Sequence, residues 1–227
     1  MVDYPRLLQV MDNVDSLLVR WGVKPAASWQ DARRARKLYA GKLRRGLPQY
    51  GDYIGLTPFS PSSRNIPHDV TKAMPLADEI DIYQSEDVFE HLPYNVMPDV
   101  LNHVYDALRP GGFFRLSLPD YRADVYNSRC LYVDGEIIFD PGGGGRYADG
   151  KVVEGGHLWF PVFENVVAFI DASKFENYEI LEGYDPDGER IMKRVDYARG
   201  YVQRTSAHDP RVRSDPRPLS LIVDFFK

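Results

Sequence analysis

The sequence predicts an α/β protein built on a mostly parallel sheet with helices on both of its faces. Two observations carry this prediction. Short apolar segments alternate with helical patterns from residue 37 onward, and such alternation is typical of parallel strands joined by helices. After residue 177 the apolar segments follow one another with no helical pattern between them, which predicts an antiparallel strand pair at the end of the sheet.

Two helices are expected before the first strand. Seven apolar side chains fall at helical spacing in the first of them: Leu7, Val10, Met11, Val14, Leu17, Leu18 and Trp21. Ser28 and Asp31 form the pattern of a capping box, which begins a short second helix that runs toward Arg36. We therefore interpret residues 1–36 as an N-terminal helical cap and residues 37–227 as one folding unit.

The middle of the chain contains the alternation itself. Residues 37–40, 53–56 and 80–84 are candidate strands, and a helix with one apolar face is expected over 98–108. The run Arg109-Pro110-Gly111-Gly112 ends this helix, because the residue before proline disfavours helical backbone and glycine permits the reversal. The next strand is expected over residues 113–118.

The last third of the chain changes in composition. Residues 139–156 are rich in glycine, and the pattern FDPGGGGRYADGK indicates either a hairpin or lid beside a binding site or a simple surface loop. A helix over 162–175 and a strand over 178–181 follow. Residues 190–204 are expected to be extended, and 219–226 form a final strand.

The overall composition limits the classes of function. The 227 residues are 44% hydrophobic and 27% charged, as in an ordinary soluble protein. A net charge of -5 argues against nucleic acid as a partner, since nucleic-acid-binding proteins usually carry a basic surplus. The single cysteine, Cys130, favours a reducing compartment. With no apolar run of membrane-spanning length and no signal-peptide pattern, we expect a cytoplasmic protein without a membrane partner, and we leave a homodimer open.

Four motifs in a fixed order carry a family resemblance. They are HDVT at residue 68, EHLP at residue 90, LRPGG at residue 108 and SLPD at residue 117. Together with the C-terminal tail, this arrangement resembles the class I S-adenosylmethionine-dependent methyltransferases, and more narrowly the small methyltransferases of polysaccharide modification. The resemblance covers residues 37–227. It implies a Rossmann-like fold and the cofactor S-adenosylmethionine.

The resemblance also implies where the cofactor binds. In the family, the loop after the first strand, the end of the second strand, an Asp-hydrophobic pair and the end of a later strand contact the cofactor. The matching residues here are Gly41, Thr57, Asp69, Val70, Ser85 and Glu86. Two positions depart from the family pattern, since Leu43 replaces a second glycine and Thr57 replaces an acidic residue that binds the ribose.

A metal site is a further hypothesis. Asp87, Glu90 and His91 stand at positions i, i+3 and i+4, so on a helix they would share one face. Such ligands suit a divalent ion, here Mg²⁺ or Mn²⁺. Similar patterns occur in ubiquinone-pathway and small-RNA 3′-end methyltransferases, where the resemblance implies a metal that holds the acceptor hydroxyl. The alternative is that these carboxylates only stabilise the start of a helix.

Two residues are candidates for the base that removes a proton from the acceptor. His157 could be that base or a fourth metal ligand, and Asp120 at the end of a predicted strand could be a base or a simple turn residue.

The resemblance and these candidate residues together predict an O-methyltransferase, and the family context implies that it acts on a hydroxyl of a sugar or glycan. A phenol or quinone substrate is one alternative, and a catalytically degenerate binding subunit is another, favoured by the departures at Leu43 and Thr57. A nucleic-acid methyltransferase is disfavoured by the acidic charge.

Overall fold

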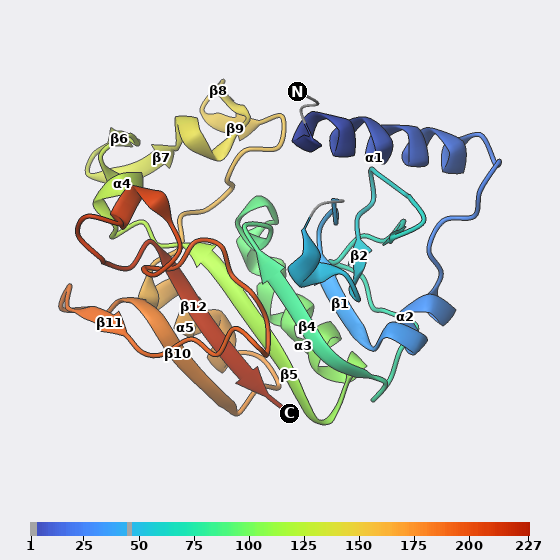
Figure 1. The fold of residues 1–227 in the computed structure, drawn as a ribbon. Helices are drawn as coiled ribbons and strands as arrows, with labels where there is room; N and C mark the ends of the chain where they lie inside the picture. The colour runs from blue at the N-terminus through green and yellow to red at the C-terminus, as the bar shows by residue number, and fades with distance from the viewer. Residues whose placement is uncertain (1–3, 45–46) are drawn as a thin grey trace.

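A single large sheet organises the part of the chain that the computed structural model describes, residues 4–44 and 47–227. Within these residues, eight strands follow the order β11-β10-β12-β5-β4-β1-β2-β3 (Figure 1). Their bounds are β1 Lys37–Ala40, β2 Ile54–Leu56, β3 Asn65–Ile66, β4 Ile80–Glu86, β5 Leu108–Pro119, β10 Asn177–Tyr184, β11 Arg190–Met192 and β12 Ser220–Phe226.

The strand directions confirm the fold class. β3, β2, β1, β4 and β5 run parallel to one another, and β12 lies antiparallel between β5 and β10. β11 adds a further antiparallel pairing with β10. The fold is therefore a Rossmann-like, mostly parallel sheet closed by antiparallel strands, as the sequence predicts.

The helices and smaller elements complete the described chain. The helices are α1 Tyr4–Arg20, α2 Trp29–Ala35, α3 Met97–Ala107, α4 Asp124–Asn127 and α5 Phe163–Asp171. Two small hairpins pair β6 Leu131–Val133 with β7 Glu136–Phe139, and β8 Arg146–Ala148 with β9 Lys151–Val153. Short 3₁₀ turns occur at Pro48–Tyr50, Phe89–His91, Tyr94–Val96, Pro141–Gly143 and Pro210–Val212. In the described ranges, no helix is long and apolar enough to cross a membrane.

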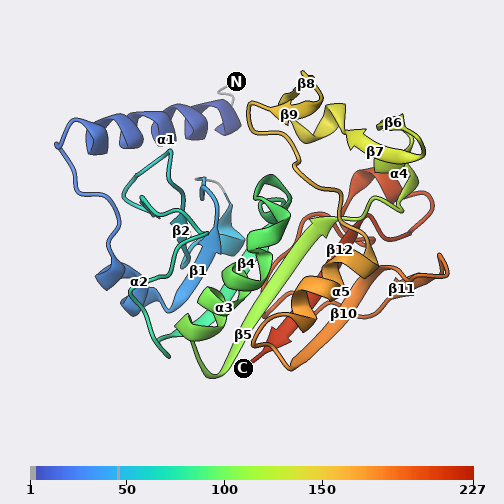
Figure 2. The ribbon, with the colours of Figure 1, turned by 180° about the vertical axis from the view of Figure 1, so that it is seen from behind.

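The main core lies between the sheet and three of the helices. α3 and α5 pack side by side on one face of the sheet (Figure 2), where Val100, Val104 and Phe169 are buried. These apolar positions recur at helical spacing, so their burial holds each helix against the strands. α2 joins the same core through Ala32, and its predicted capping box at Ser28 is present.

The opposite face of the sheet is covered differently from the prediction. Helices were expected there, but the irregular segment between β11 and β12 crosses it instead (Figure 1). Side chains on this face supply the hydrogen bonds that irregular backbone needs: the buried Arg115 donates to the carbonyl oxygens of Asp196 and Gly200 and forms a two-bond ion pair with Asp224, at 2.7 Å each. Residues 190–204, which were expected to be extended, form a strand only at β11.

α1 stands apart from the core. It is amphipathic as expected, yet its apolar side chains stay largely exposed, with Val10 at 52% and Val14 at 48% of full exposure. In both ribbon views it lies beyond the carboxyl ends of the parallel strands, on the same side of the molecule as the β8–β9 hairpin (Figures 1 and 2). The division at residue 36 stays a prediction, since α2 packs into the main core while α1 does not.

Candidate functional site

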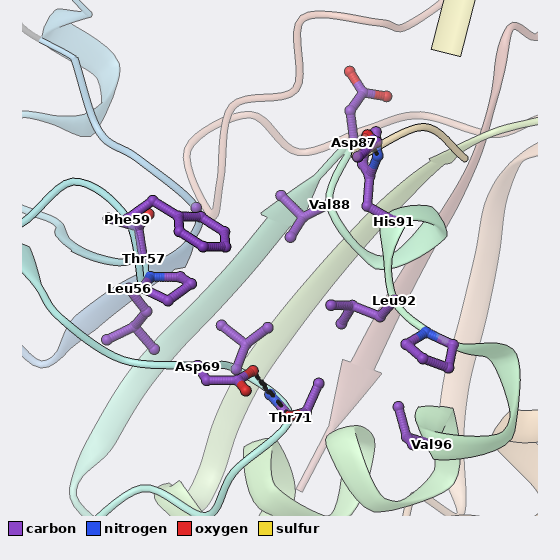
Figure 3. A pocket seen from close by; sticks show the side chains of 15 residues that line it. Leu56, Thr57, Phe59, Asp69, Thr71, Asp87, Val88, His91, Leu92 and Val96 are labelled. Atoms are coloured by element: carbon purple, nitrogen blue, oxygen red, sulfur yellow. Dashed lines mark hydrogen bonds between the residues drawn. The ribbon is translucent and has the colours of Figure 1, made fainter. Parts of the chain in front are cut away.

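A pocket of about 870 Å³ opens at the carboxyl ends of β1, β2 and β4. Figure 3 shows its two walls, one from the end of β2 and the loop after β3, the other from the segment that follows β4. Leu56, Val88, Leu92 and Val96 make these walls apolar, whereas the polar groups are few. An apolar cavity with a small number of polar groups is typical of a site for a small organic ligand.

Four of the six predicted cofactor residues line this pocket: Gly41, Thr57, Asp69 and Val70. Asp69 is held in its turn, since its Oδ1 accepts hydrogen bonds from the Thr71 backbone N–H at 3.0 Å and the Thr71 hydroxyl at 2.9 Å. The backbone bond lowers the pKa of Asp69, so this carboxylate is ionised at the pocket wall.

The loop after β1 is held by a residue that the sequence analysis did not single out. Asn65, at 1% exposure, accepts from the Leu43 backbone N–H at 2.8 Å and donates to the Leu43 carbonyl at 3.2 Å. Leu43 itself is buried. This side chain therefore fixes the loop that carries Gly41, at the place where the family pattern would have a second glycine.

Ser85 and Glu86 do not line the large pocket. Ser85 is fully buried, and its hydroxyl has no hydrogen-bond partner among the described residues. Glu86 accepts hydrogen bonds from the backbone N–H groups of Gln203 and Arg204, both at 2.9 Å, and lines a second, smaller pocket. Burial raises the pKa of Glu86 to about 7.

The second pocket has a volume of about 500 Å³ and shares Asp87 with the first. Its other side chains are mostly polar or charged: Tyr39, Lys42, Arg44, Glu86, Gln203 and Arg204. Asp87 thus stands between an apolar pocket and a polar one.

The predicted arrangement of Asp87, Glu90 and His91 on one helix face is wrong. Asp87 has a left-handed backbone, with φ of 53°, and the chain then forms only a 3₁₀ turn over Phe89–His91. The spacing i, i+3, i+4 aligns side chains only on a continuous α-helix, which this backbone interrupts. Asp87 instead pairs with Arg204, whose Nε lies 2.7 Å from its Oδ2.

Glu90 and His91 do come together, with His157 as the third member. One potential ligand atom from each of these residues lies within 4.8 Å of the other two. The His91 and His157 rings are 4.7 Å apart, and His157 Nε2 lies 3.5 Å from a carboxylate oxygen of Glu90. Burial raises the pKa of Glu90 well above its usual range and lowers the pKa of His157 to about 4.

A series of hydrogen-bonded polar side chains begins at His157. Its Nδ1 lies 2.5 Å from the Tyr121 hydroxyl, which donates to Asp140 at 2.6 Å. Arg129 holds both Asp140 oxygens, at 2.7 and 2.6 Å. Tyr121, Arg129 and Asp140 were not among the predicted site residues, because nothing in their local sequence reveals that they meet.

Asp120 serves the fold. Its side chain is fully buried and accepts hydrogen bonds from the backbone N–H groups of Arg122 at 2.9 Å and Tyr184 at 2.8 Å. It does not line the large pocket. This geometry corrects the base assignment in favour of the turn residue, since both backbone groups would lose their acceptor if Asp120 left its place.

The similarity of this chain to known proteins is distant. No protein-family model matches the chain, and no curated protein matches its sequence. Among solved structures, a SAM-dependent methyltransferase from Archaeoglobus fulgidus is 12% identical with a TM-score of 0.47, over 99% of this chain and 100% of the other. One from Methanosarcina mazei is 11% identical with a TM-score of 0.47, over 84% and 91%.

A third similar structure carries bound molecules. The 1,6-didemethyltoxoflavin-N1-methyltransferase of Burkholderia thailandensis, solved with 1,6-didemethyltoxoflavin and S-adenosylhomocysteine, is 11% identical with a TM-score of 0.46, over 100% of this chain and 91% of that one. At such low similarity, the function of this chain has to be inferred from the geometry of its own site.

Proposed function

We propose that this chain is an S-adenosylmethionine-dependent O-methyltransferase that methylates a hydroxyl group of a sugar or glycan. The observation that carries the proposal is the position of the large pocket. It opens beside β1 and β4, where the strand order reverses: β2 and β3 continue to one side and β5 to the other. Open α/β sheets bind their ligands at this switch point, beyond the carboxyl ends of the strands.

The residues of the pocket suit a nucleoside-containing cofactor. Leu56, Val70 and Leu92 provide apolar surface for a flat base. The ionised Asp69 and the Thr57 hydroxyl are groups that would bind the amino group of the base and a ribose hydroxyl. Gly41 has φ of 110°, a conformation in which glycine lets a ligand approach the backbone closely.

S-adenosylmethionine supplies an already activated methyl group when it is bound. The chain's own residues then have to align the acceptor and keep water out, and the apolar walls of the pocket suit the second task. A sugar hydroxyl also has a high pKa, so it needs a base or a cation beside it. The cluster of Glu90, His91 and His157 adjoins the pocket through His91 and would meet this need.

The second pocket supports a sugar over a phenol or quinone acceptor. Tyr39, Glu86 and Gln203 offer an aromatic ring and several hydrogen-bonding groups. Such a surface matches a polyhydroxylated molecule better than a flat apolar one. Because Asp87 lines both pockets, an acceptor in the second would lie next to a cofactor in the first.

Calorimetric titration of S-adenosylhomocysteine into the purified protein tests the cofactor. We expect micromolar binding, weakened about tenfold or more by Asp69→Ala because a charge-assisted hydrogen bond is lost. Asp171→Ala, which removes an exposed carboxylate at the end of α5, is the matched control and should bind as the natural chain does.

Acceptors are then compared with a labelled methyl donor, using sugars and oligosaccharides in one set and catechols and quinols in the other. Methylation of the second set alone would overturn the sugar assignment. Absence of binding to S-adenosylhomocysteine and S-adenosylmethionine would overturn the enzyme proposal and favour a degenerate binding subunit, to which the buried Leu43 and the Thr57 position already point.

A further inference from the structure

The carboxylate of Glu90 is the most unusual buried group in the described chain. Its side chain has no solvent exposure, and neither of its oxygens has a hydrogen-bond partner among the described residues. Burying a carboxylate without a partner is costly, so such groups normally pair with a cation or coordinate a metal. The neighbours that face Glu90 are two imidazoles, His91 and His157.

The hydrogen bonds of His157 indicate which of its nitrogens is free. The Tyr121 hydroxyl has one proton, which it donates to Asp140, so the short contact to His157 requires Nδ1–H of the imidazole to be the donor. The Nε2 atom of the neutral ring is then left with its lone pair. That atom faces Glu90, at 3.5 Å.

The hydrogen bond of His91 also indicates which of its nitrogens carries the proton. Its Nδ1 lies 2.8 Å from the carbonyl oxygen of Gly155, which accepts only, so Nδ1 carries the proton and Nε2 is left with a lone pair. Imidazoles that bind metals typically donate their other N–H to a carbonyl or carboxylate in this way. Each of the two imidazoles therefore has a nitrogen lone pair free to bind a metal, and the carboxylate of Glu90 has no competing hydrogen bond within the described residues.

We propose that Glu90, His91 and His157 bind one divalent transition-metal ion, such as Zn²⁺ or Mn²⁺, and that Tyr121 and Asp140 orient His157 for it. Two nitrogen ligands favour such ions over Mg²⁺ and Ca²⁺, which prefer oxygen. Asp87 is not a member of this cluster, and one of its carboxylate oxygens pairs with Arg204 instead. Compared with the sequence prediction, this set leaves out Asp87, includes His157, which was expected there as a possible fourth ligand, and favours a transition metal over Mg²⁺.

Three protein ligands leave at least one coordination position open. His91 lines the large pocket, so the ion would lie beside the pocket proposed for the cofactor. This part of the inference depends on the proposed function: if the chain is a methyltransferase, the ion would bind the acceptor hydroxyl and lower its pKa. The binding of the ion itself does not depend on that function.

The test is metal binding by the chelator-stripped full chain. We expect one equivalent of Zn²⁺ or Mn²⁺ in calorimetric titrations, visible absorption bands when Co²⁺ is added, and no binding of Mg²⁺ at the same concentration. The ion should also raise the Tm, because it binds only the folded chain.

The variants separate a built site from adventitious binding. Glu90→Gln should abolish binding yet leave the metal-free chain at least as stable, because it removes an unpaired buried charge. Tyr121→Phe should weaken binding about 10–100-fold through the loss of the group that orients His157. Glu176→Gln, which makes the same change at an exposed carboxylate far from the cluster in sequence, is the control and should bind as the natural chain does.

Three outcomes would overturn the proposal: no transition-metal binding by the natural chain, equal binding by Glu90→Gln, or loss of binding in Glu176→Gln. Titration of S-adenosylhomocysteine in the presence of chelator keeps the two proposals apart. Cofactor binding without metal binding would refute the metal site alone, and the reverse would refute the methyltransferase proposal alone.

Discussion

Removing the side chain of Asn65 should loosen the loop that carries Gly41 into the pocket. In Asn65→Ala, the Leu43 N–H and C=O lose the partners that lie 2.8 and 3.2 Å away, and Ser62 loses a bond of 2.6 Å. At about 1 kcal/mol for each hydrogen bond lost, and more where a buried group stays unpaired, the free energy of unfolding should fall by about 2–4 kcal/mol. For a chain of this size, that corresponds to a Tm lower by about 10 °C.

Thermal unfolding followed by circular dichroism measures this change, and titration with S-adenosylhomocysteine measures its effect on the pocket. Asn177→Ala in β10 is the matched control, since that side chain is exposed and its removal should change stability by less than about 0.5 kcal/mol. A Tm of Asn65→Ala equal to that of the control would refute the reasoning. Weaker cofactor binding with an unchanged Tm would show that the loop depends on Asn65 only when the ligand is present.

Three further changes test other parts of the structure. Arg115→Met should lower the free energy of unfolding by about 3–5 kcal/mol in urea titrations because it leaves Asp224 buried and unpaired, and a second change, Asp224→Leu, should restore only the part that is due to the unpaired charge, since two backbone carbonyls still lack their donor. Burial raises the pKa of Asp120 to about 6 from the ordinary 3.8, so its contribution to stability is present below pH 3.8 and is lost as the pH rises through about 6; Asp120→Asn should flatten the Tm profile in that window, and an unchanged slope would contradict the assignment. Gly55→Ala should destabilise by about 1–3 kcal/mol, because a Cβ would collide with Asn65 Oδ1 and lie 2.8 Å from the Gly41 carbonyl oxygen; a melting curve like that of the natural chain would show that the loop can yield.

Much of the fold could be predicted because its signals are local. The first strand occupies Lys37–Ala40 as expected, the helix predicted over 98–108 is α3 at Met97–Ala107, and the final strand predicted over 219–226 is β12. Each of these signals depends on apolar spacing and on stop residues within a few positions. The family resemblance identified candidate cofactor residues near the ends of the strands. The structure brings four of them, Gly41, Thr57, Asp69 and Val70, around one pocket.

What could not be predicted depends on contacts between distant parts of the chain. The metal hypothesis assumed a helix through Asp87, and only the structure reveals its left-handed backbone and its pairing with Arg204, which is 117 positions later in the printed sequence. Tyr121 meets His157 across 36 residues, and no local pattern records that meeting. The irregular segment on the other face of the sheet is tied down by the buried Arg115, a residue type that a sequence pattern places on the surface.

The antiparallel strand β12 has a consequence for the order in which the molecule assembles. It pairs with β5 across more than 100 residues, as Arg115 and Asp224 show, and β10 reaches the rest of the sheet only through it. Contacts so distant along the chain form slowly, because a long loop must close first. The parallel half of the sheet can therefore collapse early, while β10 and β11 must wait for β12. In hydrogen exchange, the amides of β10 and β12 should thus open together as one cooperative unit, distinct from those of β1 and β2.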